Sequence, residues 1–150
     1  MSQVPLTEAI EHYLREIYKL GQDRAEAVSI TELARAQRVS PASASAMVKK
    51  LAALGLADHA RYRGVSLTPA GERVALEVIR HHRLLELYLA ETLGVAVDDV
   101  HDEADRLEHA ISEELEARID RALGFPTHDQ HGDPIPDANL RWPRAATRSA

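Results

Sequence analysis

The chain contains no cysteine and no long hydrophobic run. The first absence excludes disulfides, thiol catalysis and cysteine ligands for zinc, and it is typical of proteins in a reducing compartment. The second excludes a membrane-spanning helix, which needs about 20 apolar residues. The N-terminus also lacks the basic start and apolar core of a signal peptide. We therefore expect a cytoplasmic protein that has no membrane partner.

Charges of both signs are plentiful, but they lie in different places. The net charge is −6, yet residues 29–63 hold six basic residues against two acidic ones. Residues 98–120 hold ten acidic residues against two arginines. This division suits contact with a polyanion in one half of the chain and with cations in the other. With 150 residues, 45% of them hydrophobic, the chain can form one globular domain or two small ones.

The basic stretch has the pattern of two short helices joined by a tight turn. Ser29 is a favourable N-cap for a helix over 30–37, and Ser40-Pro41 begins a second helix that ends near Leu54. Such a pair is typical of a helix-turn-helix, whose second helix enters the major groove of DNA. We therefore expect double-stranded DNA as a partner.

The second of these helices exposes small side chains and two lysines, which would let it approach a groove closely, although a bland alanine-rich surface helix has the same pattern. Residues 56–68 alternate weakly around a turn at Arg63-Gly64, which predicts a basic hairpin of the kind called a wing. The residues expected at DNA are Ser40, Ser43, Ser45, Ala46, Lys49, Lys50, Arg61 and Arg63.

Further helices are predicted on both sides of this region. A first helix runs from about 8 to 20, with Thr7 as its cap, and His12 on its polar side reads by itself as a surface histidine. A long helix over about 69–92 places His82 and Glu86 one turn apart. One amphipathic helix is predicted over 101–120, because apolar residues recur every four positions at Leu107, Ile111, Leu115 and Ile119.

Asp105, Glu108 and His109 lie at positions i, i+3 and i+4 of that last helix, so their side chains are expected to converge. Two carboxylates and an imidazole suit Mn²⁺, Fe²⁺ or Zn²⁺. His101, one turn earlier, is a candidate ligand of a second ion. The alternative is an acidic helix with a solvated face.

Residues 125–150 hold four of the seven prolines and few apolar side chains. This composition predicts an extended, partly disordered tail. Its His128 and His131 are potential metal ligands, but a polar tail without metal is the favoured interpretation.

Several motifs of the chain occur together and in order in one known family. They are T-E-x-x-x-x-Y-L at 7–14, L-T-P-x-G at 67–71, H-R-L at 82–84, V-H-D-E-A at 100–104, E-H at 108–109 and H-G-D-P-I-P at 131–136. In this combination the chain resembles the diphtheria toxin repressor and manganese transport regulator family.

The resemblance implies a mainly α fold. A winged helix-turn-helix would occupy residues 1–73, a helical dimerisation and metal-binding domain residues 74–124, and a Pro-rich tail residues 125–150, without the SH3-like domain of larger members. It also implies a homodimeric repressor of metal homeostasis that binds operator DNA when loaded with divalent metal. The first ion would be held by His12, Asp105, Glu108 and His109, and the second by His82, Glu86 and His101.

The resemblance also bears on which metal binds. Iron-type members have methionine and cysteine at the positions of His12 and Asp105, and manganese-type members have two carboxylates. Asp105 makes the ligand set harder, which favours Mn²⁺, with Fe²⁺ as the alternative activator. His12 fits neither pattern, and Zn²⁺, Co²⁺, Ni²⁺ or Cd²⁺ are expected to substitute in vitro.

Two other functions compete with this one. In the first, a winged-helix transcription factor ignores metal and its acidic helix serves only dimer packing. In the second, the chain is a metalloenzyme, because residues 105–109 come close to the inverted motif H-x-x-E-H. An aspartate stands where the first histidine belongs, however, and the chain has no phosphate loop or G-x-S-x-G. We therefore expect no enzyme activity and no small-molecule substrate.

Overall fold

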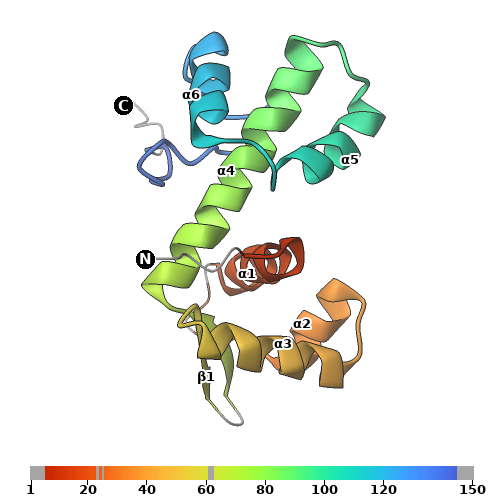
Figure 1. Cartoon of the computed structure of the whole chain (residues 1–150), viewed down its shortest axis with the longest axis vertical. Coiled ribbons are helices and arrows are strands. Elements are labelled where there is room, and N and C mark those ends of the chain that lie inside the picture. Colours follow the sequence, from red (N-terminus) through yellow and green to blue (C-terminus); the bar gives the residue numbers. More distant parts are fainter. Residues whose placement is uncertain (1–5, 23, 25, 61–62, 145–150) are drawn as a thin grey trace, which may run out of the picture. The chain divides into compact units, whose positions relative to one another are not determined.

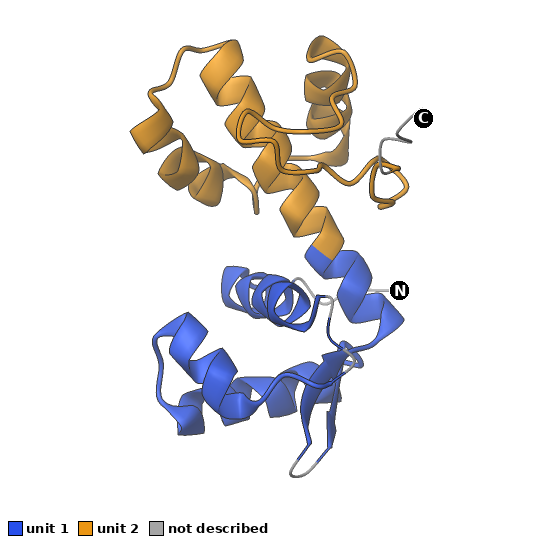
Figure 2. Ribbon diagram, turned by 180° about the vertical axis from the view of Figure 1, so that it is seen from behind, with its two compact units in different colours: residues 1–75 blue, residues 76–150 orange. Residues whose placement is uncertain are grey.

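A computed structural model of the chain describes residues 6–22, 24, 26–60 and 63–144, which form six helices and one two-stranded sheet. The chain divides into two compact units, residues 1–75 and 76–150 (Figure 2). Each unit has its own hydrophobic core. The mostly helical fold predicted from the sequence is confirmed. None of the described helices is long and apolar enough to cross a membrane.

Unit 1 begins with α1 (Glu8–Gly21), which is present as predicted (Figure 1). The side chain of Thr7 caps this helix by accepting a hydrogen bond from the backbone N–H of Ile10. The apolar side of α1 is buried through Leu14 and Ile17, which are 0% and 2% exposed. This side packs into the core of unit 1 with residues of the next two helices.

The helix-turn-helix consists of α2 (Ile30–Gln37) and α3 (Pro41–Ala53). The hydroxyl groups of Ser29 and Ser40 accept hydrogen bonds from backbone N–H groups three residues further on, as N-caps do. The turn between the helices passes through Arg38, whose left-handed φ of 56° ends α2 without a glycine. Both helices and both caps were predicted from the sequence.

The hairpin that follows is formed by β1 (Ala57–Ala60) and β2 (Gly64–Leu67), which pair antiparallel. Val28, in the segment before α2, adds a short bridge to it. Its N–H and C=O exchange hydrogen bonds of 2.9 and 2.8 Å with Val65. The predicted wing is therefore present and is tied to the helix-turn-helix by its backbone.

Two glycines allow backbones to come close together in unit 1. A Cβ at Gly64, whose φ is +95°, would lie 2.3 Å from the carbonyl oxygen of Val28. A Cβ at Gly71 would lie 1.9 Å from the carbonyl oxygen of Leu56. Gly71 is the last residue of the motif at 67–71. A larger residue at this position would clash with the backbone of Leu56, which explains the glycine of the motif.

The long helix α4 (Pro69–Glu91) has its first residues in unit 1 and the rest in unit 2. Thr68 caps it, because its Oγ1 accepts a hydrogen bond of 3.1 Å from the N–H of Gly71. The same hydroxyl donates to the carbonyl of Gly55 at 2.8 Å, which joins the start of α4 to the end of the helix-turn-helix.

Two helices stand where the sequence predicted one. They are α5 (Val97–Leu107) and α6 (Glu113–Ala122), so the prediction of a continuous helix over 101–120 is wrong. The second helix begins after Ser112, whose hydroxyl accepts a hydrogen bond from the N–H of Leu115. A serine cap followed by acidic residues is a strong start signal, and here it outweighs the four-residue apolar period. Leu107 and Leu115, two residues of that period, are exposed.

The tail packs against α4. Ile135 is only 2% exposed and belongs to the core of unit 2 with residues of α4, α5 and α6. Arg83 donates a hydrogen bond of 2.5 Å to the carbonyl of Pro134 and lies over the ring of Trp142, 5.7 Å from its centroid. Arg80 donates to the carbonyl of Pro136 at 2.9 Å. Residues 126–144 are thus irregular, and the part from Pro134 to Trp142 contacts α4, whereas the sequence predicted an extended, partly disordered tail.

Candidate metal centre

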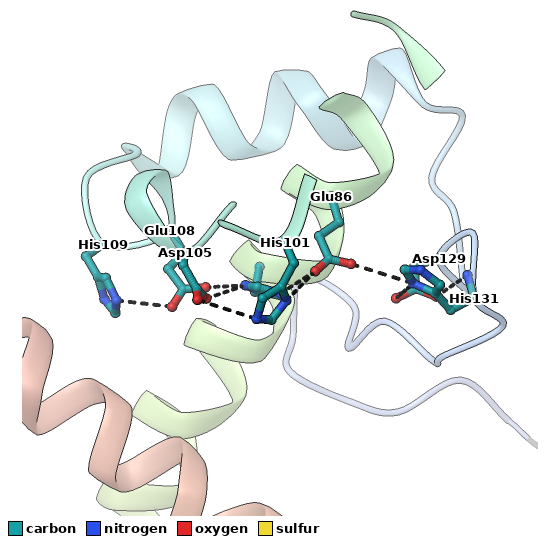
Figure 3. Close-up of polar contacts among 8 residues, drawn as sticks. Glu86, His101, Asp105, Glu108, His109, Asp129 and His131 are labelled. Carbon is teal, nitrogen blue, oxygen red and sulfur yellow. Dashed lines mark hydrogen bonds and ion pairs between the residues drawn. The ribbon is translucent and has the colours of Figure 1, made fainter. Parts of the chain in front are cut away.

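Unit 2 contains a row of histidine and carboxylate side chains, which come from α4, α5, the residues after α5 and the tail (Figure 3). His82 of α4 lies at its centre. Its Nδ1 is 2.5 Å from Glu108 Oε2 and 3.3 Å from Asp105 Oδ1. Its Nε2 is 2.5 Å from Glu86 Oε1 and 3.2 Å from His101 Nδ1. One imidazole therefore contacts four other potential ligands.

The electrostatics of the row depend on burial. The side chain of Glu108 is 0% exposed and that of Glu86 is 6% exposed. Burying two carboxylates is costly unless positive charge lies close by. Burial by itself lowers the pKa of His82, but hydrogen bonds and charges from Glu108 and Glu86 outweigh it and raise this pKa to about 9.

The same contacts lower the pKa of Glu86. Burial by itself raises the pKa of its carboxyl group, but His82 and His101 lower this pKa to about 2. Without an ion, a proton on His82 therefore supplies the positive charge that the carboxylates need. Because a ligating histidine must be neutral, a metal ion would displace that proton.

Three sets of residues have ligand atoms within 4.8 Å of one another in this unit. Each set mixes imidazole nitrogen with carboxylate oxygen, the donors that suit Mn²⁺, Fe²⁺ and Zn²⁺. The sets are His82, Asp105 and Glu108; His82, Glu86 and His101; and Glu86, Asp129 and His131. The residues present therefore fit a divalent transition metal.

The three sets differ in spacing. Ligand atoms about 2.1 Å from an ion lie about 3 to 4 Å from one another. In the third set His131 Nδ1 is 3.7 Å from Glu86 Oε2 and 4.0 Å from Asp129 Oδ2, which already leaves such a space. The two sets that contain His82 include contacts of 2.5 Å and must open slightly to admit an ion.

Asp129 was not predicted as a ligand, and His131 was named only as a potential one. Asp129 Oδ1 accepts hydrogen bonds from the N–H groups of His131 and Asp133, both at 2.9 Å, while Oδ2 faces the ring of His131. The D-x-H spacing at 129–131 was available in the sequence. It carried little weight because the tail was expected to be loose.

The other predicted ligands are divided between the units. His109 Nε2 lies 3.1 Å from Glu108 Oε1, on the opposite side of that carboxylate from His82, and its side chain is 6% exposed. His101 also lies 3.5 Å from Asp105. His12 lies on α1 in unit 1 and is half-buried.

A second polar network lies beside the row. His81 Nδ1 is 3.1 Å from the carbonyl oxygen of Glu108, and its Nε2 is 2.5 Å from Glu116 Oε2. Burial lowers the pKa of His81, but the hydrogen bond and charge of Glu116 outweigh it and raise this pKa above its ordinary value. Arg80, whose side chain is 5% exposed, pairs with Glu116 and with Asp120 Oδ2, the latter at 3.0 Å.

The predicted DNA-contacting residues that the structure describes lie on α3, at its N-cap and in the hairpin of unit 1. Those that are described are exposed, except for the half-buried Ser45, and Arg61 lies outside the described residues. The hydroxyl of Ser40 accepts from the N–H of Ser43 and donates to its Oγ at 3.0 Å. It is therefore engaged in the cap, whereas Lys49 and Lys50 are exposed.

Fold and side-chain row together define a winged helix-turn-helix protein with a helical unit suited to metal ions. Residues 5–65 match the family model "Iron dependent repressor, N-terminal DNA binding domain". Residues 68–137 match "Iron dependent repressor, metal binding and dimerisation domain". The chain therefore belongs to the iron-dependent repressor family, the family of the diphtheria toxin repressor that its motifs indicated.

Individual relatives agree. The diphtheria toxin repressor of Corynebacterium diphtheriae is 34% identical over 131 residues, which are 87% of this chain and 58% of the relative. An uncharacterised helix-turn-helix regulator of Methanocaldococcus jannaschii is 32% identical over 76% of this chain and 91% of its own length. The chain thus spans less than two thirds of the diphtheria toxin repressor.

Solved structures show the same fold. A manganese-dependent transcriptional repressor in complex with manganese superposes with a TM-score of 0.81 at 46% sequence identity, over 91% of this chain and 63% of that one. The structure of ScaR with bound Zn²⁺ superposes with a TM-score of 0.78 at 33% identity, over 89% of this chain and 62% of that one.

Proposed function

We propose that this protein is a transcriptional repressor of metal homeostasis, which binds operator DNA as a homodimer once a divalent ion is bound. The row around His82 carries this proposal. Its buried carboxylates are neutralised by a histidine proton that an ion can replace. The same chain carries a helix-turn-helix with exposed lysines on α3. No catalytic activity is part of this function, and the protein would act in the cytoplasm, where the DNA is.

The proposed first ion is held by Asp105, Glu108 and His109 together with His12 of α1. Support comes from the family motifs and from the two oxygens of Glu108, one of which faces His82 and the other His109. When bound, the ion supplies positive charge to the clustered carboxylates. Its charge would keep Glu108 ionised in its buried position.

The proposed second ion is held by His82, Glu86 and His101, with Asp129 and His131 completing the site. Glu86 supports this assignment because its Oε1 faces His101 and its Oε2 faces His131. The larger relatives extend beyond the matched region. In this chain the tail places two further potential ligands, Asp129 and His131, beside Glu86.

Mn²⁺ is the proposed activator, with Fe²⁺ as the alternative. The ligand row contains only nitrogen and oxygen donors, and harder donors favour Mn²⁺ over softer ions. The manganese-dependent repressor named above is 46% identical to this chain. Zn²⁺, Co²⁺, Ni²⁺ or Cd²⁺ are expected to bind in vitro, since imidazole also suits these metals.

Homodimerisation is supported by apolar side chains that unit 2 leaves exposed. Val97 is 65% exposed, Phe125 63%, Leu93 60% and Leu115 47%. Contiguous apolar surface marks contacts with another chain, and we propose that these side chains contribute to such a surface. A dimer would carry two α3 helices, which fit DNA half-sites about 34 Å apart, one turn of the double helix.

The test is fluorescence anisotropy of labelled DNA from upstream of the protein's own gene, with MnCl₂ titrated in and chelator added afterwards. We expect binding that depends on Mn²⁺ and is reversed by the chelator. Asp105→Ala should abolish the response. Asp102→Ala, which changes an exposed carboxylate on the same helix outside the row, should preserve it. Binding that ignores metal in the unaltered protein would instead support the metal-independent winged-helix factor.

A further inference from the structure

We propose that His81 is a positioning residue, which fixes the backbone of Glu108 so that its side chain is ready for an ion. His81 itself would bind no metal. This inference rests on the proposed role of Glu108 as a ligand.

The hydrogen bonds of His81 keep both of its nitrogens away from the metal row. Its Nδ1 lies 3.1 Å from the carbonyl oxygen of Glu108, and because a carbonyl can only accept, Nδ1 must carry the hydrogen. Its Nε2 is 2.5 Å from the carboxylate of Glu116. Of the two consecutive histidines on α4, only His82 therefore faces the row.

Glu108 stands where such support is needed. It is the first residue after α5, and carbonyl groups at the end of a helix lose their intrahelical partners. Its side chain must place one oxygen near His82 and the other near His109. A rotation of its peptide group would displace both oxygens, so the hydrogen bond from His81 holds the ligand through its main chain.

His81 is anchored in turn. Glu116 of α6, which holds its Nε2, also pairs with Arg80. Arg80 donates further hydrogen bonds to Asp120 and to the carbonyl of Pro136. The position of His81 is therefore fixed by α4, α6 and the tail together. Partners of this kind, which orient a ligand without touching the ion, typically change metal affinity by about 10- to 100-fold when they are removed.

Three substitutions separate positioning from general packing. His81→Ala removes both hydrogen bonds. His81→Asn keeps an N–H donor at the place of Nδ1, and His81→Gln keeps one near the place of Nε2. His59→Ala, at an exposed position of β1, is the control. Mn²⁺ binding to the full chain is followed by the electron paramagnetic resonance signal of free Mn²⁺, and hydrogen exchange of residues 108–112 is measured without metal.

We expect His81→Ala and His81→Gln to weaken Mn²⁺ binding by about 10- to 100-fold. Both should also speed amide exchange at 108–112. His81→Asn should restore both properties to nearly the original level, and His59→Ala should change neither. Rescue by asparagine but not by glutamine is a result that a merely structural role would not give.

Other results would overturn the inference. Mn²⁺ affinity in His81→Ala equal to that of the unaltered protein would do so, and so would failure of asparagine to rescue. If the unaltered protein binds no Mn²⁺, the proposed function fails. Hydrogen exchange then decides the role of His81 alone, and equal exchange at 108–112 in all variants would overturn it.

Discussion

His82 is the residue on which the charge balance of unit 2 depends. In the metal-free protein its proton offsets Glu108 and Glu86, both buried, and this interaction raises its pKa from 6.5 to about 9. A bound metal ion would make the same offset with a higher charge. The proposed chemistry of the site is therefore an exchange of a proton for an ion, and its pH dependence has a definite sign.

A histidine whose pKa rises on folding stabilises the folded state fully below its unfolded pKa, and this contribution is lost as the pH rises through the folded value. The free energy of unfolding of the metal-free protein should therefore fall between pH 6.5 and 9. At about 1.4 kcal/mol per pKa unit, the loss is at most about 3 kcal/mol. Urea unfolding in the presence of chelator at both pH values measures it.

The control for this prediction is His82→Gln, which removes the titrating group. The fall in stability between the two pH values should shrink in this variant. It should not vanish, because the pKa of His81 is raised as well. An equally steep fall in His82→Gln would contradict the role given to His82.

At the scale of elements, the sequence predicts well those helices and strands that are held by interactions between residues close together in the chain. The first three helices follow their caps at Thr7, Ser29 and Ser40, whose hydrogen bonds reach only three residues along the chain. The hairpin follows from its turn. These elements of unit 1 could therefore be predicted closely from the sequence.

The break between α5 and α6 and the packing of the tail could not be predicted in this way. At the break, a four-residue apolar period competed with the cap at Ser112, and periodicity alone does not decide such a conflict. The tail owes its order to Arg80 and Arg83, which reach its carbonyl groups from more than 50 residues away in sequence. For the same reason Asp129 was missed as a potential ligand and His131 was not favoured as one.

Ser112→Ala tests the start of α6. Loss of an N-cap costs about 1 kcal/mol, so the free energy of unfolding should fall by roughly that amount in urea. The matched change is Ser66→Ala, at an exposed position of β2, which should cost less. Equal stability of Ser112→Ala and the unaltered protein would show that the break does not depend on this cap.

At the scale of the whole molecule, the number of ions per chain depends on whether the tail contributes ligands. His131→Ala should weaken binding of the proposed second Mn²⁺ by about tenfold or more, because it removes a potential ligand beside Glu86. His128→Ala, in the same tail but outside the three ligand sets, should leave binding unchanged. Isothermal titration calorimetry separates the two ions. Two unchanged binding events in His131→Ala would exclude His131 from the site.

The contact between Arg83 and Trp142 has a practical consequence. Trp142 is the sole tryptophan of the chain, and its ring lies against the residue that follows His82. The indole emission of an unlabelled sample therefore comes from a single place, where the tail meets the helix that bears His82 and Glu86. The protein thus carries an intrinsic optical probe of the packing between its tail and α4.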